Sequence, residues 1–466
     1  MTRAAGAARR SASPRRTLFL ASLGFFLITL DILIVNVALT RIGDELGGGP
    51  TGQQWVIDGY TLMFAALLLS AGALSDRVGA KRTLGAGIAL FLLASVACAL
   101  APTVGALIAA RVVQGVAAAA MLPASMALIR EAFPDARERA RALGVWAVGG
   151  AVATAVGPLL GGLLTTLDWR LVFVINLPVC VGMLVLLQTV APSATASVPF
   201  DRAGQALSLI ALAALMYGLI EEGAAGFAEP LVVTALAVAV VGVTAFLVVQ
   251  SRSRHPMMPP ELFRSREMRI SLGVGFAFMV GNFGSVFVVS LYLQQHLGLS
   301  PLLAGLVFLP SAAFAVAGNV VSGRLSNRFG PRVPVVAGLA SMAVGLLAMA
   351  ATASLGSPWA FAALLVLTGA GGSIAMPPVT SVVLASAPAE RASTASAIFN
   401  TFRQVGGAVA IAVLGGLLAG ASSFVPGLRL SFVIAASVVV AAAVAAAFLR
   451  RDRVVETGAA PASASA

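Results

Sequence analysis

The chain has 466 residues, of which 59% are hydrophobic and only 10% are charged, and its mean hydropathy is +0.98. Soluble domains carry about a quarter charged residues, so a single water-facing globular domain is excluded. The formal net charge of +12 does not indicate nucleic-acid binding, because no basic stripe lies on a segment that could fold as a soluble domain.

Apolar runs of about 20 residues, the length at which a helix crosses a bilayer, recur along the chain and explain this composition. Strands of alternating polarity are missing from the sequence, which disfavours a β-barrel. We therefore predict an all-α polytopic membrane protein. Its fourteen spans are expected at 17–40, 54–74, 83–101, 103–129, 141–163, 170–190, 204–220, 231–250, 270–294, 300–322, 333–353, 358–386, 396–420 and 429–449.

The first apolar run and the two middle runs each allow two interpretations. Arginines precede the run from Leu18 to Leu30, as in a signal peptide, but the run continues to Leu39 and is too long for one, so we expect an uncleaved first span. A twelve-span alternative would make 200–250 a linker. Its two runs, 204–220 and 231–249, contain no charge, whereas a linker would be polar, so fourteen spans are favoured.

The basic residues are distributed unevenly between the two sides of the predicted membrane. With a cytoplasmic N-terminus, 25 of the 30 Lys and Arg residues fall in cytoplasmic segments. Three fall on the other side and two, Arg111 and Arg403, inside spans. This positive-inside bias predicts a plasma-membrane protein with both termini in the cytoplasm.

The loops after the second and the tenth spans are similar in sequence. The first reads GALSDRVGAKR from Gly72 to Arg82, and the second reads GRLSNRFGPR from Gly323 to Arg332. Each follows the second span of a six-span block, which predicts two parallel halves with two spans inserted between them. The expected divisions are a basic tail (1–16), a six-helix bundle (17–190), two inserted spans (204–250), a cytoplasmic linker (251–269), a second six-helix bundle (270–449) and a tail (450–466).

Several motifs occur in a fixed order along the chain. They are LDILIVNVAL from Leu30, WVIDGY from Trp55, the GALSDRVGAKR loop, LIAARVVQG from Leu107, GPLLGG from Gly157, DWR from Asp168, NLP from Asn176, YLQQ from Tyr292, GLSP from Gly298 and NTFRQVGG from Asn400. With these motifs the chain resembles the major facilitator superfamily, in particular its fourteen-span drug:proton antiporters and, among those, methylenomycin-type resistance exporters of actinobacteria. One departure is Thr40, where the family pattern usually has proline. The resemblance covers about 18–449 and implies two six-helix bundles that rock around a midplane cavity.

Ionisable residues inside a membrane are costly and are functional candidates for that reason. Asp31 lies eight residues from the outer end of the first span, and Arg111 lies eight residues into the fourth, about 12 Å deep in each case. An Asp31–Arg111 pair is therefore feasible, either as a proton-coupling site or as a static ion pair that holds two helices together. Asp58 is the third proton-coupling candidate; the alternative is a hydrated residue at the start of the second span, beside the interfacial Trp55 and Tyr60.

Two glycine-containing motifs are candidates for gating. Gly157, Pro158, Gly161 and Gly162 allow a kink and close helix packing, and the resemblance implies a seam that blocks proton leakage. In the loop after the second span, Gly72 is expected to allow close helix contact, Gly79 a sharp turn, and Asp76 a bond to a neighbouring helix end or arginine. Arg77, Lys81 and Arg82 there also serve topology, and Asn327 replaces the acid in the second loop.

Substrate-binding candidates are individually weak, and no cofactor is expected other than the proton gradient as an energy source. The polar residues within or beside the spans are Asn36, Gln114, Asn282, Gln294, Asn400, Arg403 and Gln404. Cys98 and Cys180 are interpreted as buried thiols, and His255 and His296 lie in loops on opposite sides, which leaves no metal cluster. Glu221 and Glu222 are interpreted as solvated residues at the end of the seventh span.

The resemblance predicts a monomeric proton-coupled antiporter that exports a small amphiphilic compound or antibiotic and binds no nucleic acid. A proton-coupled uptake symporter or facilitator on the same fold is the alternative. A membrane enzyme is disfavoured, because the spans contain no buried cluster of histidines or carboxylates. The second half carries Arg403 but no acid within its spans, so we expect substrates that are neutral, anionic or at most monocationic.

Overall fold

The computed structural model describes residues 13–195, 200–226, 228–388, 391–421 and 423–450. Nearly all of the two predicted tails, 1–16 and 450–466, lies outside the described residues.

The described chain consists of helices joined by short loops, as predicted. Thirteen helices are long and apolar enough to cross a membrane. A shorter apolar segment, built from α6 (Leu171–Val174) and α7 (Asn176–Leu187), corresponds to the predicted sixth span. Each of the fourteen predicted runs is therefore helical. The other helices before the linker are α1 (Pro14–Leu46), α2 (Gly49–Val78), α3 (Ala80–Ala99), α4 (Val104–Ala132), α5 (Ala136–Leu167), α8 (Arg202–Ala225) and α9 (Pro230–Arg252). After it come α10 (Arg266–Leu291), α11 (Pro301–Val307), α12 (Leu309–Phe329), α13 (Arg332–Thr352), α14 (Pro358–Ala385), α15 (Ala392–Ala419) and α16 (Phe424–Ala446).

Several helices differ in detail from the predicted spans. The first two begin earlier than predicted, because polar residues continue the helices beyond the apolar runs. The predicted tenth span is interrupted at Phe308, just before Pro310, which has no backbone N–H to continue the helix. The predicted linker 251–269 is shorter, since α9 ends at Arg252 and α10 begins at Arg266 around a single 3₁₀ turn, η1 (Pro260–Arg264).

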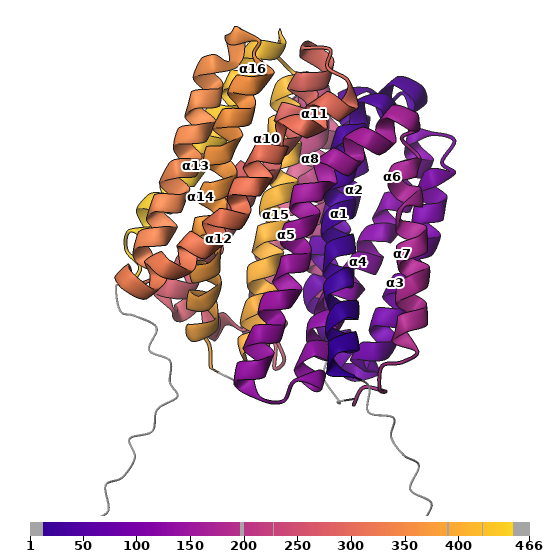
Figure 1. Cartoon of the computed structure of the whole chain (residues 1–466), viewed down its shortest axis with the longest axis vertical. Coiled ribbons are helices and arrows are strands. Elements are labelled where there is room, and N and C mark those ends of the chain that lie inside the picture. Colours follow the sequence, from indigo (N-terminus) through magenta and orange to yellow (C-terminus); the bar gives the residue numbers. More distant parts are fainter. Residues whose placement is uncertain (1–12, 196–199, 227, 389–390, 422, 451–466) are drawn as a thin grey trace, which may run out of the picture.

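Helix packing follows the repeat in the sequence. In the first group, α1–α7, α1 packs on α5, α4 packs on α2 and α3, and α3 packs on α7. In the second group, α10–α16, the equivalent pairs are α10 with α15, α14 with α12 and α13, and α13 with α16. The two groups stand side by side in Figure 1. The exact domain boundaries remain predictions.

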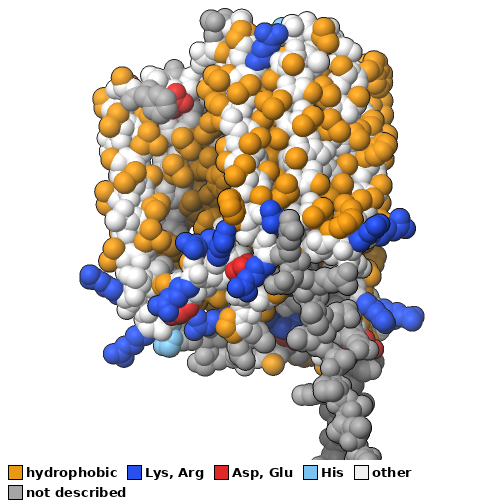
Figure 2. Space-filling view, turned by 90° about the vertical axis from the view of Figure 1, so that its left-hand side faces the viewer, with side chains coloured by type: hydrophobic (Ala, Val, Ile, Leu, Met, Phe, Trp, Pro, Cys, Tyr) orange, Lys and Arg blue, Asp and Glu red, His pale blue; other side chains and the backbone are white. Residues whose placement is uncertain are grey.

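Charge separates the two ends of this bundle. The described chain enters at Ser13 and leaves at Arg450 on the same end, at the bottom of Figure 1. Figure 2 shows a broad apolar band with Lys and Arg side chains gathered below it. We call this lower end the basic end, and the other the opposite end. An apolar band of this kind, bounded by charge, is the surface of a multi-pass membrane protein.

The two groups are packed together near the opposite end. Gln295 donates to Gln53 at 3.2 Å, and a β-carbon added at Gly415 of α15 would lie 2.3 Å from the Gln54 amide nitrogen of α2. Toward the basic end, α12 diverges from α5 in Figure 1. Large apolar side chains on the diverging segments are exposed, including Val148 (57%) and Val320 (57%). The interior is therefore closed at the opposite end.

The inserted pair, α8 and α9, packs on itself and places α8 against α2 and α15. The Trp55 indole donates to Glu221 at 3.0 Å, and Gln205 donates to the Ala66 carbonyl at 3.1 Å, so polar contacts attach α8 to the first group. Against α15 the contact is apolar: Gly223 lies on Gly416, and Met216 and Ile220 pack with Ala408 and Ala412. Glu221 and Glu222, interpreted from the sequence as solvated residues, are both half-buried, and Glu221 accepts from Trp55.

Candidate functional site

A fully buried ion pair forms the polar centre of the first group. Arg111 of α4 and Asp31 of α1 are both 0% exposed, and Arg111 Nη1 contacts Asp31 Oδ2. The Arg111 Nε donates to the Val56 carbonyl of α2 at 3.0 Å, and its Nη1 to Gln114 Oε1 at 2.6 Å. The equal depth that the sequence predicts for Asp31 and Arg111 is therefore realised as direct contact.

Two amides complete the coordination of the Asp31 carboxylate. Its Oδ1 accepts from Gln114 Nε2 at 2.9 Å and from Asn176 Nδ2 at 2.8 Å. Ser95 of α3 accepts from the same two amides, at 2.9 and 3.3 Å. The network joins α1, α3, α4 and α7 with no net charge. A buried ion pair is tolerated when additional hydrogen bonds satisfy its remaining lone pairs, as they do here.

Aromatic rings surround the guanidinium of this pair. Its carbon lies 4.4 Å from the centre of the Tyr60 ring and 5.8 Å from that of Phe173. Placing Tyr60 in an interfacial belt was wrong, since it is fully buried and donates to the Ile28 carbonyl at 3.4 Å. Arg111 Nη2 is a buried donor without a partner among the described residues. Asn176 Oδ1 is a buried acceptor that also lacks a partner among them, so the site keeps one unused donor and one unused acceptor.

Sequence reasoning missed Ser95, Asn176 and Phe173 as members of the site. Asn176 and Tyr60 lie within motifs that carried the family resemblance, and that was the available signal. Ser95 lies in a run of small and apolar residues that gives no indication of a role. Gln114, expected as a substrate contact, has both ends of its amide occupied by the network.

Asp58 is buried at the contact between the two helix groups. Its side chain is 0% exposed and accepts from Thr61 at 3.1 Å, while its Oδ2 has no partner among the described residues. The hydrated-residue alternative was wrong, because α2 begins at Gly49, about 13 Å further out. Asp58 follows Gln54 by four residues and so shares the helix face that packs on α15.

The glycines of α5 form a close seam with α1 and α11. A β-carbon added at Gly161 would lie 2.6 Å from the Ile34 carbonyl oxygen, and one at Gly162 would lie 2.5 Å from that of Pro301. From the other side, one at Gly305 would lie 2.3 Å from the Pro158 carbonyl oxygen. At Gly157 the nearest atom would be the Leu33 side chain, at 2.9 Å. Any larger residue in this seam would force the backbones apart.

The loop between α2 and α3 is held within the first group. Asp76 pairs with Arg130 of α4 at 3.2 Å, and both side chains are close to half exposed. Gly79 has φ +99°, which supports the predicted turn, whereas Gly72 has only a loose neighbour, the Pro123 side chain at 3.9 Å. The expected tight contact at Gly72 was wrong. Arg77 and Arg82 are exposed at the basic end.

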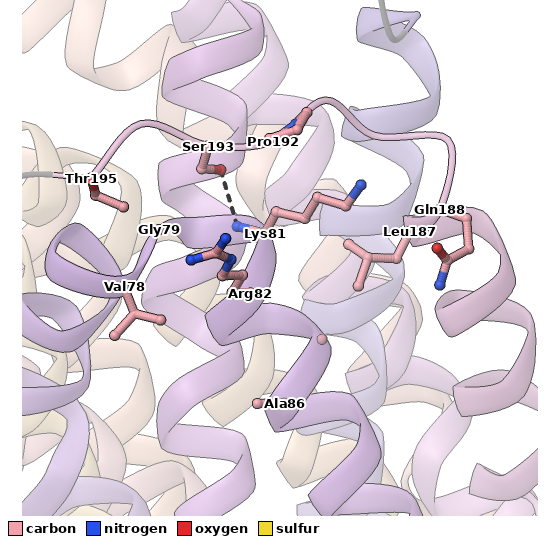
Figure 3. A pocket seen from close by; sticks show the side chains of 11 residues that line it. Val78, Gly79, Lys81, Arg82, Ala86, Leu187, Gln188, Pro192, Ser193 and Thr195 are labelled. Carbon is pink, nitrogen blue, oxygen red and sulfur yellow. Dashed lines mark hydrogen bonds between the residues drawn. The ribbon is translucent and has the colours of Figure 1, made fainter.

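A strap of chain after α7 covers this loop, as Figure 3 shows. Ser193 accepts from the Lys81 backbone N–H at 3.0 Å and donates to Glu131 at 2.6 Å, while Lys81 Nζ donates to the Val190 carbonyl at 2.5 Å. Beneath the strap is a cavity of about 660 Å³ lined by Lys81, Arg82 and a mixture of polar and apolar residues. The strap fixes the first-group loop at the basic end.

The second group carries a cation within one of its helices, Arg403, with few polar contacts around it. Arg403 of α15 is half-buried and donates to Asn400 at 3.2 Å. Its guanidinium carbon lies 5.7 Å from the centre of the Phe278 ring and 5.9 Å from that of the Phe399 ring. None of the described acids forms an ion pair with it. Its Nε and the Oε1 of Gln404 are buried without hydrogen-bond partners among the described residues.

The other substrate candidates are dispersed. Asn36 and Asn400 each bond the carbonyl one turn earlier in their own helix, and Gln294 bonds Ser290. Asn282 is half-buried on α10. The two cysteines are buried free thiols, as predicted, and no cluster of three metal-ligating side chains occurs in the part of the chain that the structure describes.

The two repeated groups of apolar helices, the inserted pair α8 and α9, and the buried ion pair of the first group define a polytopic membrane transporter. The chain belongs to the Major Facilitator Superfamily, whose model matches residues 21–411. This is a transporter family that acts on small molecules.

Proteins that are similar to this chain in sequence or in fold support the family assignment. The chain is 39% identical over 409 residues to the multidrug resistance protein Stp of Mycobacterium tuberculosis, covering 86% of this chain and 75% of that protein. It is 37% identical over 411 residues to the methylenomycin A resistance protein of Streptomyces coelicolor, covering 88% and 86%. Among solved structures, a peptide transporter in complex with sulfate is similar in fold, with a TM-score of 0.70 at 16% identity over 92% of this chain and 93% of that one.

Proposed function

We propose that the protein is a proton-coupled antiporter that exports a small amphiphilic compound or antibiotic across the plasma membrane. The observation that carries this proposal is the fully buried Asp31–Arg111 pair, an ionisable group held inside the membrane region. The relatives named for drug and antibiotic resistance support the direction of transport. No cofactor is required, since the proton gradient supplies the energy.

Protonation of Asp31 is the coupling step in this scheme. A proton from outside bonds to a carboxylate oxygen of Asp31 and removes its charge, which weakens the contact with Arg111 and releases the amides of Gln114 and Asn176. Loss of the proton to the cytoplasm restores the pair. Asp58 is a second candidate carrier, because its free oxygen lies on the helix face that packs on the moving second group.

The seam and the first loop act as gates in the proposed cycle. In the proposed cycle, the glycine contacts between α5 and α11 close the outer side of the described conformation. In the outward-open state these contacts separate and the basic ends of α5 and α12 approach each other. Asp76, now bonded to Arg130, is then free to contact the second group.

The basic end is assigned to the cytoplasm, as the positive-inside bias requires. Reporter fusions after residue 225, between α8 and α9, should report outside, and fusions after residue 260 should report inside. A cytoplasmic report from residue 225 would contradict the fourteen-span topology. We propose that the protein functions as a monomer.

The proposal is tested in two steps. Minimum inhibitory concentrations across a chemically diverse panel that includes methylenomycin A and tetracenomycin C, with and without expression, identify a substrate. Inside-out vesicles with an acidic lumen should then accumulate that substrate, and the proton ionophore nigericin should abolish accumulation. Movement of the substrate out of an acidic lumen together with protons would instead indicate an uptake symporter.

A further inference from the structure

A groove runs along the outer surface of the second group between α10 and α16, starting at the basic end. Its volume is about 640 Å³, and its mouth is formed by Arg266 and Arg269 of α10 and Phe448 beyond α16. Figure 2 shows the apolar band of this face hollowed above basic side chains. This groove is separate from the buried ion pair and from the seam between the groups.

Small residues create the groove. Its walls are lined on one helix by Gly273 and Ala277, and on the other by Ala441, Ala442 and Ala445. A β-carbon added at Gly273 would meet no atom within 4 Å, so this position opens onto empty space. From Arg266 to Ala277 the helix rises by about 16 Å. That is close to the depth of one leaflet, since the hydrocarbon core is about 30 Å thick.

Positive charge is concentrated at the mouth of the groove. Both arginines are exposed, and the Arg266 guanidinium lies 5.3 Å from the Phe448 ring centre. The neighbouring acid, Glu267, is engaged by Arg450 at 3.5 Å and by Ser265 at 3.3 Å. Arg269 forms no ion pair with a described residue. The mouth therefore offers uncompensated guanidinium groups at the edge of the apolar band.

We propose that this groove binds an anionic phospholipid of the cytoplasmic leaflet. Arg266 and Arg269 bind the phosphate of the headgroup, and one acyl chain lies in the trough between α10 and α16. Charge favours this occupant over a zwitterionic lipid, because guanidinium groups pair strongly with phosphate and juxtamembrane arginines attract anionic lipids. The length of the trough favours a lipid over free phosphate, which would leave the apolar walls uncovered.

The test measures lipid binding to the purified full-length protein by native mass spectrometry. Phosphatidylglycerol and phosphatidylcholine with identical acyl chains are titrated separately, and inorganic phosphate is offered as a competitor. We expect the first phosphatidylglycerol to bind at least tenfold more tightly than phosphatidylcholine, and millimolar phosphate to leave it bound. The R266Q/R269Q variant should lose this preference, because each arginine is expected to contribute about fivefold to the affinity for phosphatidylglycerol.

Two further variants separate the headgroup from the groove. G273L, whose side chain enters open space in the trough, should weaken binding of both lipids at least fivefold. The matched control R252Q/R254Q removes two arginines from the same end, outside the groove, and should bind both lipids within twofold of the wild type. Equal affinity for the two lipids, equal loss in the control, or displacement by phosphate would overturn the proposal. So would a dimer that G273L converts to monomer, because a second copy would then occupy the groove.

Discussion

The two helix groups repeat each other in packing but differ in how they hold charge. In the first group, Asp31 and Arg111 neutralise each other, and amides from two further residues complete the network. In the second group, Arg403 has no acid partner among the described residues, and its Nε lacks a hydrogen bond. In the proposed cycle, the first group therefore supplies the acid that carries the proton, and the second group supplies a cation for a substrate anion.

The same contrast recurs at the basic end. The loop of the first group carries the Asp76–Arg130 pair and is covered by the strap at Ser193. The loop of the second group has the exposed Asn327 in the equivalent place. Polar contacts therefore concentrate in the first group, and those of the inserted α8 also go to that group.

The largest effect is expected at Asp31. Asp31→Asn should reduce proton-driven export by about a hundredfold or more, because no other acid shares its contact with Arg111. The measurement is substrate accumulation in acid-lumen vesicles, normalised to inserted protein. Since this change leaves Arg111 without a counter-ion, the D31N/R111Q variant is the matched control for stability and should be equally inactive. Wild-type coupled transport by either variant would eliminate Asp31 as the proton carrier.

Removal of the cation alone should destabilise the first group. Arg111→Gln leaves the buried Asp31 carboxylate without its partner, which costs about 3–5 kcal/mol of unfolding free energy. D31N/R111Q replaces the pair by neutral groups and should recover most of that loss. Unfolding free energies of the wild type, the two single variants and the double variant, measured in mild detergent, give the coupling free energy between Asp31 and Arg111. Additive losses in the double variant would mean that the two side chains act independently.

A smaller and more selective effect is expected in the second group. Arg403→Gln should reduce export of anionic substrates by about tenfold and leave neutral ones unchanged, because the proposed charged hydrogen bond from Arg403 to a substrate anion is lost. Arg403→Lys keeps the charge and should retain most of the anion export. The wild type should not export a bis-quaternary dye. Strong proton-dependent efflux of such a dication would contradict the division of tasks between the groups.

The smallest effect is expected at the loops. Asp76→Asn breaks a pair whose side chains are 44% and 49% exposed, so stability should fall by no more than about 1 kcal/mol, and less at high salt. Asn327→Asp in the second loop should change stability by less still, because Asn327 is exposed. Thermal unfolding of D76N and N327D at two salt concentrations measures these losses of stability. A larger loss in N327D than in D76N would show that the loops do not differ as proposed.

Most of the fold was predictable because the bilayer imposes a simple requirement on the sequence. Apolar runs long enough to cross a bilayer are helical here, since a helix satisfies its backbone polar groups within one segment and the alternating strands that a closed barrel needs are missing from the sequence. The fourteen runs, the repeat and the uneven placement of arginines follow from local composition alone. The depth of Asp31 and Arg111 could also be counted along their helices, because the rise per residue is constant.

Tertiary structure alone decided which side chains meet. That Asn176 and Ser95 join the Asp31 site, and that Asp58 is fully buried, depend on how distant helices pack. The same holds for the groove at Gly273, which exists because α16 faces it with alanines. Such contacts join residues far apart in the chain, and the hydropathy of a single helix carries no record of its neighbours.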